Sequence, residues 1–91
     1  MGPATFKIIH EVKNDPNPAG YTLCFQWGYL KYTDGSPSEH GYRFIYRKPN
    51  GNLQAARAQA RIPSVAAMME LIERARRAGW LEKCEIELDC P

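Results

Sequence analysis

Residues 42–54 read YRFIYRKPNGNLQ, a strand that runs into a tight turn. Aromatic side chains occupy every second position from Tyr42, which is typical of a strand with one buried face. A type I′ turn would put Pro49 in the closing pair, where its missing N–H is a disadvantage. A type I turn followed by a bulge gives Pro49 its favoured position and Gly51 the left-handed conformation. We therefore predict the second kind of turn.

This turn sets the register of a further strand over residues 53–62. It places Arg47 opposite Leu53 and Arg43 opposite Arg57. One face of the strand carries alanines and then Ile62, and these small side chains would let a helix lie close to the sheet. The opposite face of the two paired strands would display a group of polar residues: Arg43, Arg47, Arg57, Gln59 and Arg61.

A helix is predicted between Ser64 and Gly79. Ser64 follows a proline and is a favourable N-cap, and Gly79 suits the left-handed residue that ends a helix. Trp80 would pack onto the last turn. The apolar stripe at helical spacing consists of Val65, Met68, Met69, Leu71, Ile72 and Ala75.

Three more strands are expected, over residues 6–12, 21–32 and 84–90. The first alternates Phe6, Ile8, His10 and Val12 on one side. The second carries Tyr21, Leu23, Phe25, Trp27 and Tyr29 on one side, with Gly28 as a candidate bulge. Residues 14–20 and 33–41 are predicted to be flexible loops. The expected fold is one α+β domain over residues 1–91, an antiparallel sheet in the order β-β-β-β-α-β with one helix packed on one face.

Part of this pattern resembles a known family. The segment Tyr42-Arg43-Phe44, the turn Asn50-Gly51 and the helix opening at Ser64 are similar to small bacterial YegP-like domains. The resemblance covers about residues 42–75, and the spacing between Gly51 and Ser64 is longer than is typical of the family. Because the family's function is itself obscure, the resemblance implies a topology and no activity.

Composition narrows the class of protein. The chain has 91 residues, a net charge of +2 and no apolar run long enough to span a bilayer. Its N-terminus shows no signal-peptide pattern. Three cysteines are an odd number, which favours reduced thiols and a cytoplasmic location over a disulfide framework. The cysteines and histidines have no zinc-site spacing, so no metal or cofactor is expected.

The sequence contains no recognised catalytic motif. The one conceivable nucleophile and base combination is Cys24 with His10 or His40, and no third group is positioned by spacing to orient it. We therefore expect a protein that is not an enzyme.

Positive charge is concentrated in the middle of the chain. Residues 40–81 carry eight Lys and Arg against two carboxylates, a local net charge of +6. Arginines on one sheet face predict a binding module for an anionic partner, with nucleic acid first and an acidic protein second. In that reading Gln59 could touch a base edge. The alternative is that solvent or the molecule itself neutralises these arginines, and Glu85, Glu87 and Asp89 are the candidates for internal neutralisation.

A second functional class is assembly. The predicted C-terminal strand presents Cys84, Ile86 and Leu88 on its apolar side and could pair with another chain as a sheet edge. Either a monomer or a homodimer is compatible with the sequence.

Overall fold

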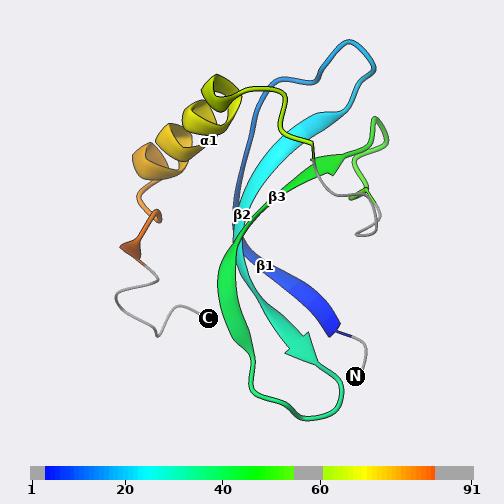
Figure 1. Ribbon diagram of the computed structural model, residues 1–91, viewed down its shortest axis with the longest axis vertical. Helices are drawn as coiled ribbons and strands as arrows, with labels where there is room; N and C mark the ends of the chain where they lie inside the picture. Colours follow the sequence, from blue (N-terminus) through cyan, green and yellow to red (C-terminus); the bar gives the residue numbers. More distant parts are fainter. Residues whose placement is uncertain (1–3, 55–60, 84–91) are drawn as a thin grey trace.

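A computed structural model describes residues 4–54 and 61–83 of the chain. These residues form three strands, β1 (Ala4–Lys13), β2 (Thr22–Tyr32) and β3 (Glu39–Arg47), and one helix, α1 (Val65–Ala78) (Figure 1). The strands make one antiparallel sheet in the order β1-β2-β3. The α+β class and the antiparallel pairing are therefore as predicted.

The predicted order β-β-β-β-α-β is wrong, because the described sheet has three strands. The predicted turn is present: Lys48 N–H donates to Asn52 O (2.7 Å), and Gly51 has a φ of 87°. Beyond it, the described residues pair with β3 through a bridge between Arg47 and Leu53 and a hydrogen bond from Gln54 N–H to Tyr46 O.

The rest of the predicted fourth strand divides into two parts. Residues 55–60 lie outside the described residues, and residues 61–64 have no regular structure. Two physical features oppose a strand there. Pro63 has no N–H for a ladder, and the carbonyl of Arg61 accepts a hydrogen bond from the Tyr46 hydroxyl (2.9 Å).

The core lies between the sheet and α1. Leu23, Phe25 and Trp27 alternate along β2 and are buried, as the sequence predicts. The Phe25 ring stacks on that of Phe44, with centroids 4.7 Å apart. Tyr42 packs beside Trp27, so the aromatic faces of β2 and β3 form one layer beneath the helix.

The helix boundaries agree with their predicted caps. The Ser64 hydroxyl accepts a hydrogen bond from Ala67 N–H (3.1 Å), and Gly79 ends the helix with a φ of 89°. Trp80 is buried in the core. The predicted apolar stripe is partly wrong, because Val65 and Met69 are exposed. Of the predicted stripe, Leu71 and Ala75 are the residues that are buried against the sheet.

A bulge in β1 changes which side of the sheet its residues face. Ile8 pairs with Gly28 and His10 pairs with Trp27, which leaves Ile9 as the extra residue. Ile9 and Val12 therefore pack on the core, and the His10 ring stacks on Trp80. The prediction that Phe6, Ile8, His10 and Val12 share one face is wrong, because this bulge separates the first two from the last two.

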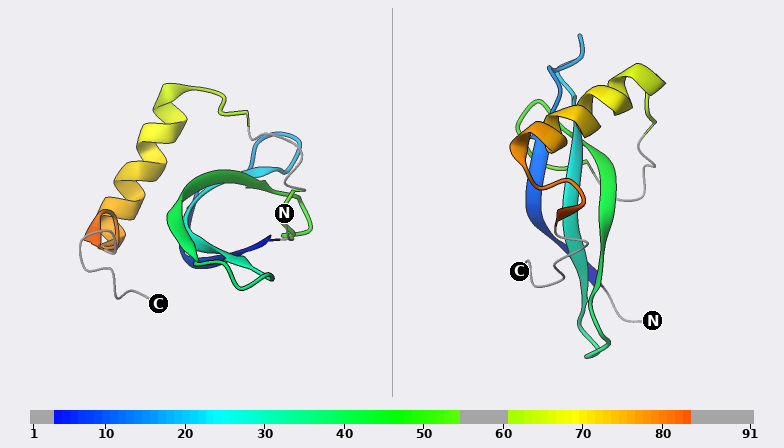
Figure 2. Two further views of the ribbon diagram at one scale, coloured as in Figure 1. Left: turned by 60° about the horizontal axis from the view of Figure 1, so that its bottom comes forward. Right: turned by 90° about the vertical axis from the view of Figure 1, so that its left-hand side faces the viewer.

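The sheet is strongly curled, and α1 lies against its convex side (Figure 2). The helix contacts β1 and β2. Side chains on the opposite side of each strand line a concave face, which includes Glu11 of β1, Gln26 of β2 and Arg43 of β3. Within the described residues no helix has the length and apolar character needed to cross a membrane.

Candidate functional site

The concave face holds two of the predicted site residues in one hydrogen-bonded chain. Arg43 Nε donates to Gln26 Oε1 (2.7 Å), and Gln26 Nε2 donates to Glu11. Glu11 also accepts from Arg47 Nε (3.1 Å). Gln26 is fully buried, so both of its polar atoms need partners, and this chain supplies them.

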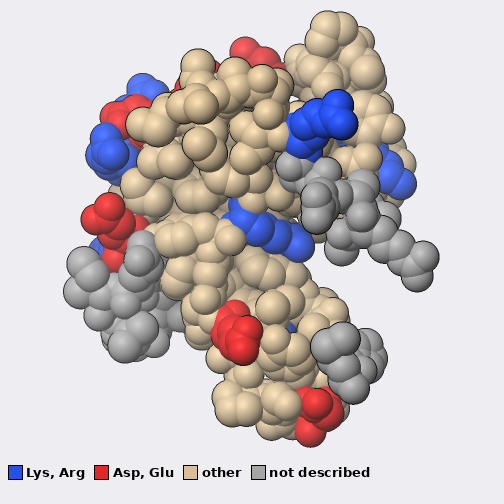
Figure 3. All heavy atoms as spheres, in the orientation of Figure 1, with Lys and Arg blue, Asp and Glu red and all other residues tan. Residues whose placement is uncertain are grey.

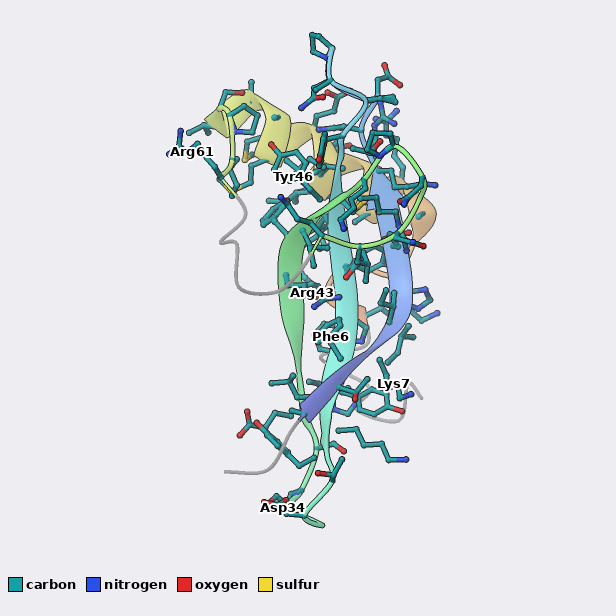
Figure 4. All side chains as sticks on the ribbon, turned by 90° about the vertical axis from the view of Figure 1, so that its right-hand side faces the viewer. Phe6, Lys7, Asp34, Arg43, Tyr46 and Arg61 are labelled. Carbon is teal, nitrogen blue, oxygen red and sulfur yellow. The ribbon has the colours of Figure 1, made fainter. Side chains whose placement is uncertain are left out.

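Arg43 is held between a hydrogen bond and an aromatic ring. Its guanidinium carbon lies 3.9 Å from the centroid of the Phe6 ring, a cation–π arrangement (Figure 4). The side chain is half-buried, and loss of solvation is the main cause that lowers the pKa of Arg43 from its ordinary value. Glu11 opposes that shift. The guanidinium is thus a cation in a fixed position.

Arg47 is more fully engaged. Its Nη2 lies 3.0 Å from Glu11 Oε2 in an ion pair whose side chains are 26% and 18% exposed. Its Nη1 donates to Gly51 O (2.8 Å), which ties the turn to the end of β3. Glu11 therefore supplies internal compensation for one of the two arginines on the concave face.

The other predicted site residues do not join this group. Arg61 is exposed and lies beyond the β3 edge, away from Arg43 (Figure 4). Arg57 and Gln59 lie outside the described residues, as does the predicted interaction edge of Cys84, Ile86 and Leu88. The candidates for internal neutralisation, Glu85, Glu87 and Asp89, also lie outside them. On the face seen in Figure 3, Lys and Arg atoms form several separate groups and no continuous patch.

A hollow of about 280 Å³ lies at the turn end of the concave face, and we call it the cationic hollow. Among the described residues, three basic ones line it and no acidic one does. Lys13 and Lys48 are exposed and have no ion pair with a described carboxylate. The lining residues are Lys13, Asn14, Pro16, Gly20, Thr22, Arg47, Lys48, Pro49 and Gly51.

A second hollow, of about 300 Å³, lies at the opposite end of the concave face, and we call it the glycine hollow. It forms where two glycines, Gly28 and Gly41, pair directly across β2 and β3. A Cβ at Gly28 would lie 2.7 Å from the Phe6 ring, whereas a Cβ at Gly41 would meet nothing within 4 Å. The lining residues are Phe6, Leu30, Glu39, His40, Gly41, Tyr42 and Arg43.

Cys24 does not form a nucleophile and base pair with either histidine. Its side chain is buried on the concave side of β2, whereas His10 and His40 pair with Trp27 and Tyr29 on the other side. The pKa of Cys24 is raised to about 11, mainly by burial and next by the charge of Glu11. Such a thiol is protonated at neutral pH. The described residues also hold no group of three or more His, Cys, Asp or Glu placed to bind a metal ion.

Sequence reasoning missed the residues that organise this face. Gln26 carried a usable signal, because it is a polar residue between two buried aromatics in a strand and so needs partners on the other side. Glu11 carried no such signal, because the bulge at Ile9 determines which side of the sheet it faces. Lys13 and Lys48 flank predicted loops and give no periodic signal.

No family model, curated protein or solved structure matches this chain. The resemblance to YegP-like domains therefore stays a prediction, and the function has to be argued from the two hollows.

Proposed function

We propose that this chain is a non-enzymatic binding module for an anionic partner, with nucleic acid as the first candidate and an acidic protein as the second. The observation that carries the proposal is the cationic hollow, whose lining, as far as the chain is described, includes three basic residues and no acidic one. Glu11 offsets the charge of Arg47, so two positive charges remain beside the hollow, on Lys13 and Lys48.

The two lysines suit phosphate contacts. An ammonium group on a flexible stem acts as a point charge, so it can follow a phosphate without a fixed geometry. Arg47 differs, because Glu11 and Gly51 hold its guanidinium in place. It adds a fixed positive group to the wall of the hollow while the lysines adapt to the ligand.

The two lysines of the cationic hollow, beside Arg47, and Arg43 farther along the concave face place positive charge at two separate points, which favours a long ligand with repeated anionic groups. Arg43 and Arg47 lie four positions apart on one side of the strand, which corresponds to about 13 Å. A nucleic-acid strand presents a phosphate at every nucleotide and can use both ends of such a face. This spacing is the reason for placing nucleic acid before an acidic protein.

Fluorescence anisotropy with labelled oligonucleotides of about twelve nucleotides tests the proposal. Single-stranded RNA, single-stranded DNA, duplex DNA and polyglutamate serve as probes at about 50 and 200 mM salt. We expect nucleic-acid binding that weakens with salt. The variants Lys13→Ala and Lys48→Ala should each reduce the slope of log affinity against log salt by about 1.

Lys31→Ala is the matched control, because Lys31 is an exposed lysine at the far end of β2 and its removal changes the net charge equally. An equal loss of affinity in this control would contradict the assignment to the hollow. Binding of polyglutamate alone would favour the acidic protein, and no binding of any probe at low salt would reject the proposal.

A further inference from the structure

We propose that the glycine hollow is a slot for an unpaired guanine base of a single-stranded nucleic acid. The inference rests on the proposed function, because the cationic hollow at the other end of the concave face would hold phosphates of the same strand. Four features carry it: the shape of the slot, a donor at one end, an acceptor at the other and apolar walls.

The shape comes from a missing side chain. Glu39, Gly41 and Arg43 lie on the same side of β3, so the glycine separates two charged groups. The space above Gly41 is open, whereas the Phe6 ring fills the space above its partner Gly28. The resulting volume of about 300 Å³ is at the lower end of the range for ligand pockets, which suits one planar base.

Arg43 forms the donor end. Its Nε is committed to Gln26, and its guanidinium lies over the Phe6 ring, so the group is oriented before any ligand arrives. The Nη groups have no hydrogen-bond partner among the described residues, which leaves them available to a ligand at the hollow. The most common specific contact of arginine with a base is bidentate donation to O6 and N7 of guanine.

Glu39 forms the acceptor end. It is exposed and receives one hydrogen bond, from the Tyr32 hydroxyl to Oε2 (3.3 Å), so Oε1 remains available within the described structure. Guanine carries N–H donors on the edge next to O6, which a carboxylate can accept. Adenine places an amino donor beside N7 and would turn it toward the donors of Arg43. The pair of ends therefore selects guanine over adenine.

The slot also selects an unpaired base. In a duplex the N–H edge of guanine is committed to cytosine, so Glu39 could not reach it. In single strands, bases stack on aromatic rings and on guanidinium planes and use the edges that pairing would hide. Phe6 and Leu30 supply the apolar wall on which a base can pack. About 13 Å of β3 separates the Cα atoms of Glu39 and Arg43, a span that favours a purine over the shorter pyrimidines.

Anisotropy titrations with two labelled RNA strands test the slot: a uridine tract, and the same tract with one guanosine at its centre. We expect the guanosine strand to bind about tenfold more tightly. Gly41→Val should remove this preference and leave binding of the uridine tract unchanged, because its side chain would extend into the slot from a position where a Cβ meets nothing within 4 Å. Ala66→Val is the matched control, since it adds the same groups at an exposed position of α1. Glu39→Ala should also remove the preference.

The outcomes of these titrations distinguish a failure of the guanine slot from a failure of the proposed function. If the wild-type protein binds neither strand, both the proposed function and the proposed guanine slot are wrong. If it binds both strands equally, or if Gly41→Val keeps the preference, the slot is wrong while nucleic-acid binding stands. Equal affinity for a duplex of the guanosine strand would also overturn the slot. Free guanosine monophosphate should bind at least tenfold more weakly than the guanosine strand. Equal affinity would show that the slot binds a free nucleotide and would contradict the proposal that the base belongs to a strand.

Discussion

The Glu11 carboxylate and the Arg47 guanidinium are 3.0 Å apart, although β2 lies between their strands and 36 positions separate them in the chain. The sheet is curled (Figure 2), and the two side chains meet across its concave face. Gln26 of the middle strand takes part in the same network. The pair therefore joins the two outer strands and also sets the charge of the candidate site.

Replacing Glu11 with glutamine should separate these two roles. We expect Glu11→Gln to lower the free energy of unfolding by about 2 kcal/mol, because Arg47 loses its charged partner in a mostly buried place. The same variant should bind single-stranded RNA more tightly, since the concave face gains one positive charge. Urea denaturation and anisotropy measure the two effects. Glu73→Gln, which breaks an exposed pair on α1, is the control and should change stability by less than about 0.5 kcal/mol.

The two paired glycines should respond differently to alanine. Gly28→Ala should destabilise the domain by about 3 kcal/mol or prevent folding, because its Cβ would overlap the Lys7 carbonyl oxygen and press on the Phe6 ring. Gly41→Ala should be neutral or stabilising by up to about 1 kcal/mol, since the space above it is open and the unfolded chain loses freedom. Thermal unfolding of both variants tests the difference, and equal destabilisation would contradict the arrangement around Phe6.

The Cys24 thiol should make stability fall at high pH. Its pKa is raised to about 11 in the folded protein from an ordinary value of 9.0, mainly because burial disfavours the thiolate. Between these two pH values the folded state keeps a proton that the unfolded state has lost, so each unit of pH costs stability. The total loss should approach about 2–3 kcal/mol by pH 11. The measurement is the difference between the pH profiles of the wild type and Cys24→Ala, because lysines and tyrosines titrate in both proteins.

The N-cap of α1 gives a local test of the helix. Ser64→Ala should lower the free energy of unfolding by about 1 kcal/mol, because the Ala67 N–H loses the acceptor that now caps it. Ser64→Asp keeps an acceptor and adds a favourable charge at the helix N-terminus, so it should retain the wild-type stability. Urea denaturation compares the three proteins. Equal loss in both variants would show that the hydroxyl contributes by some route other than capping.

Features with a local cause could be predicted from the sequence. Ser64 and Gly79 set the helix ends through capping chemistry, and the turn at Pro49 and Gly51 follows from the conformations that these residues prefer. The buried side of β2 follows from the alternation of Leu23, Phe25 and Trp27. Each of these signals lies within a few residues of the structure that it determines.

Features with a long-range cause could not be predicted. The bulge at Ile9 depends on how β1 meets Gly28 and Trp27, and no local pattern marks it. The sheet leaves Val65 and Met69 exposed, although their spacing on the helix is correct for an apolar stripe. For the site, the sequence predicted that Arg43 and Arg47 share a face, but their partners come from other strands.

The bulge changes which residues of β1 face the core and which face the concave side. Before the bulge, Phe6 and Ile8 face the concave side, where Phe6 helps to enclose the glycine hollow. After it, Val12 packs on the core under the helix, and the residues that alternate with it, Glu11 and Lys13, face the concave side. The part of β1 before the bulge therefore contributes to the glycine hollow, and the part after it contributes to the core. Recognition at the Phe6 end could be re-engineered by exchanging residues 4–8 as a cassette, with the helix-packed half of the strand left intact.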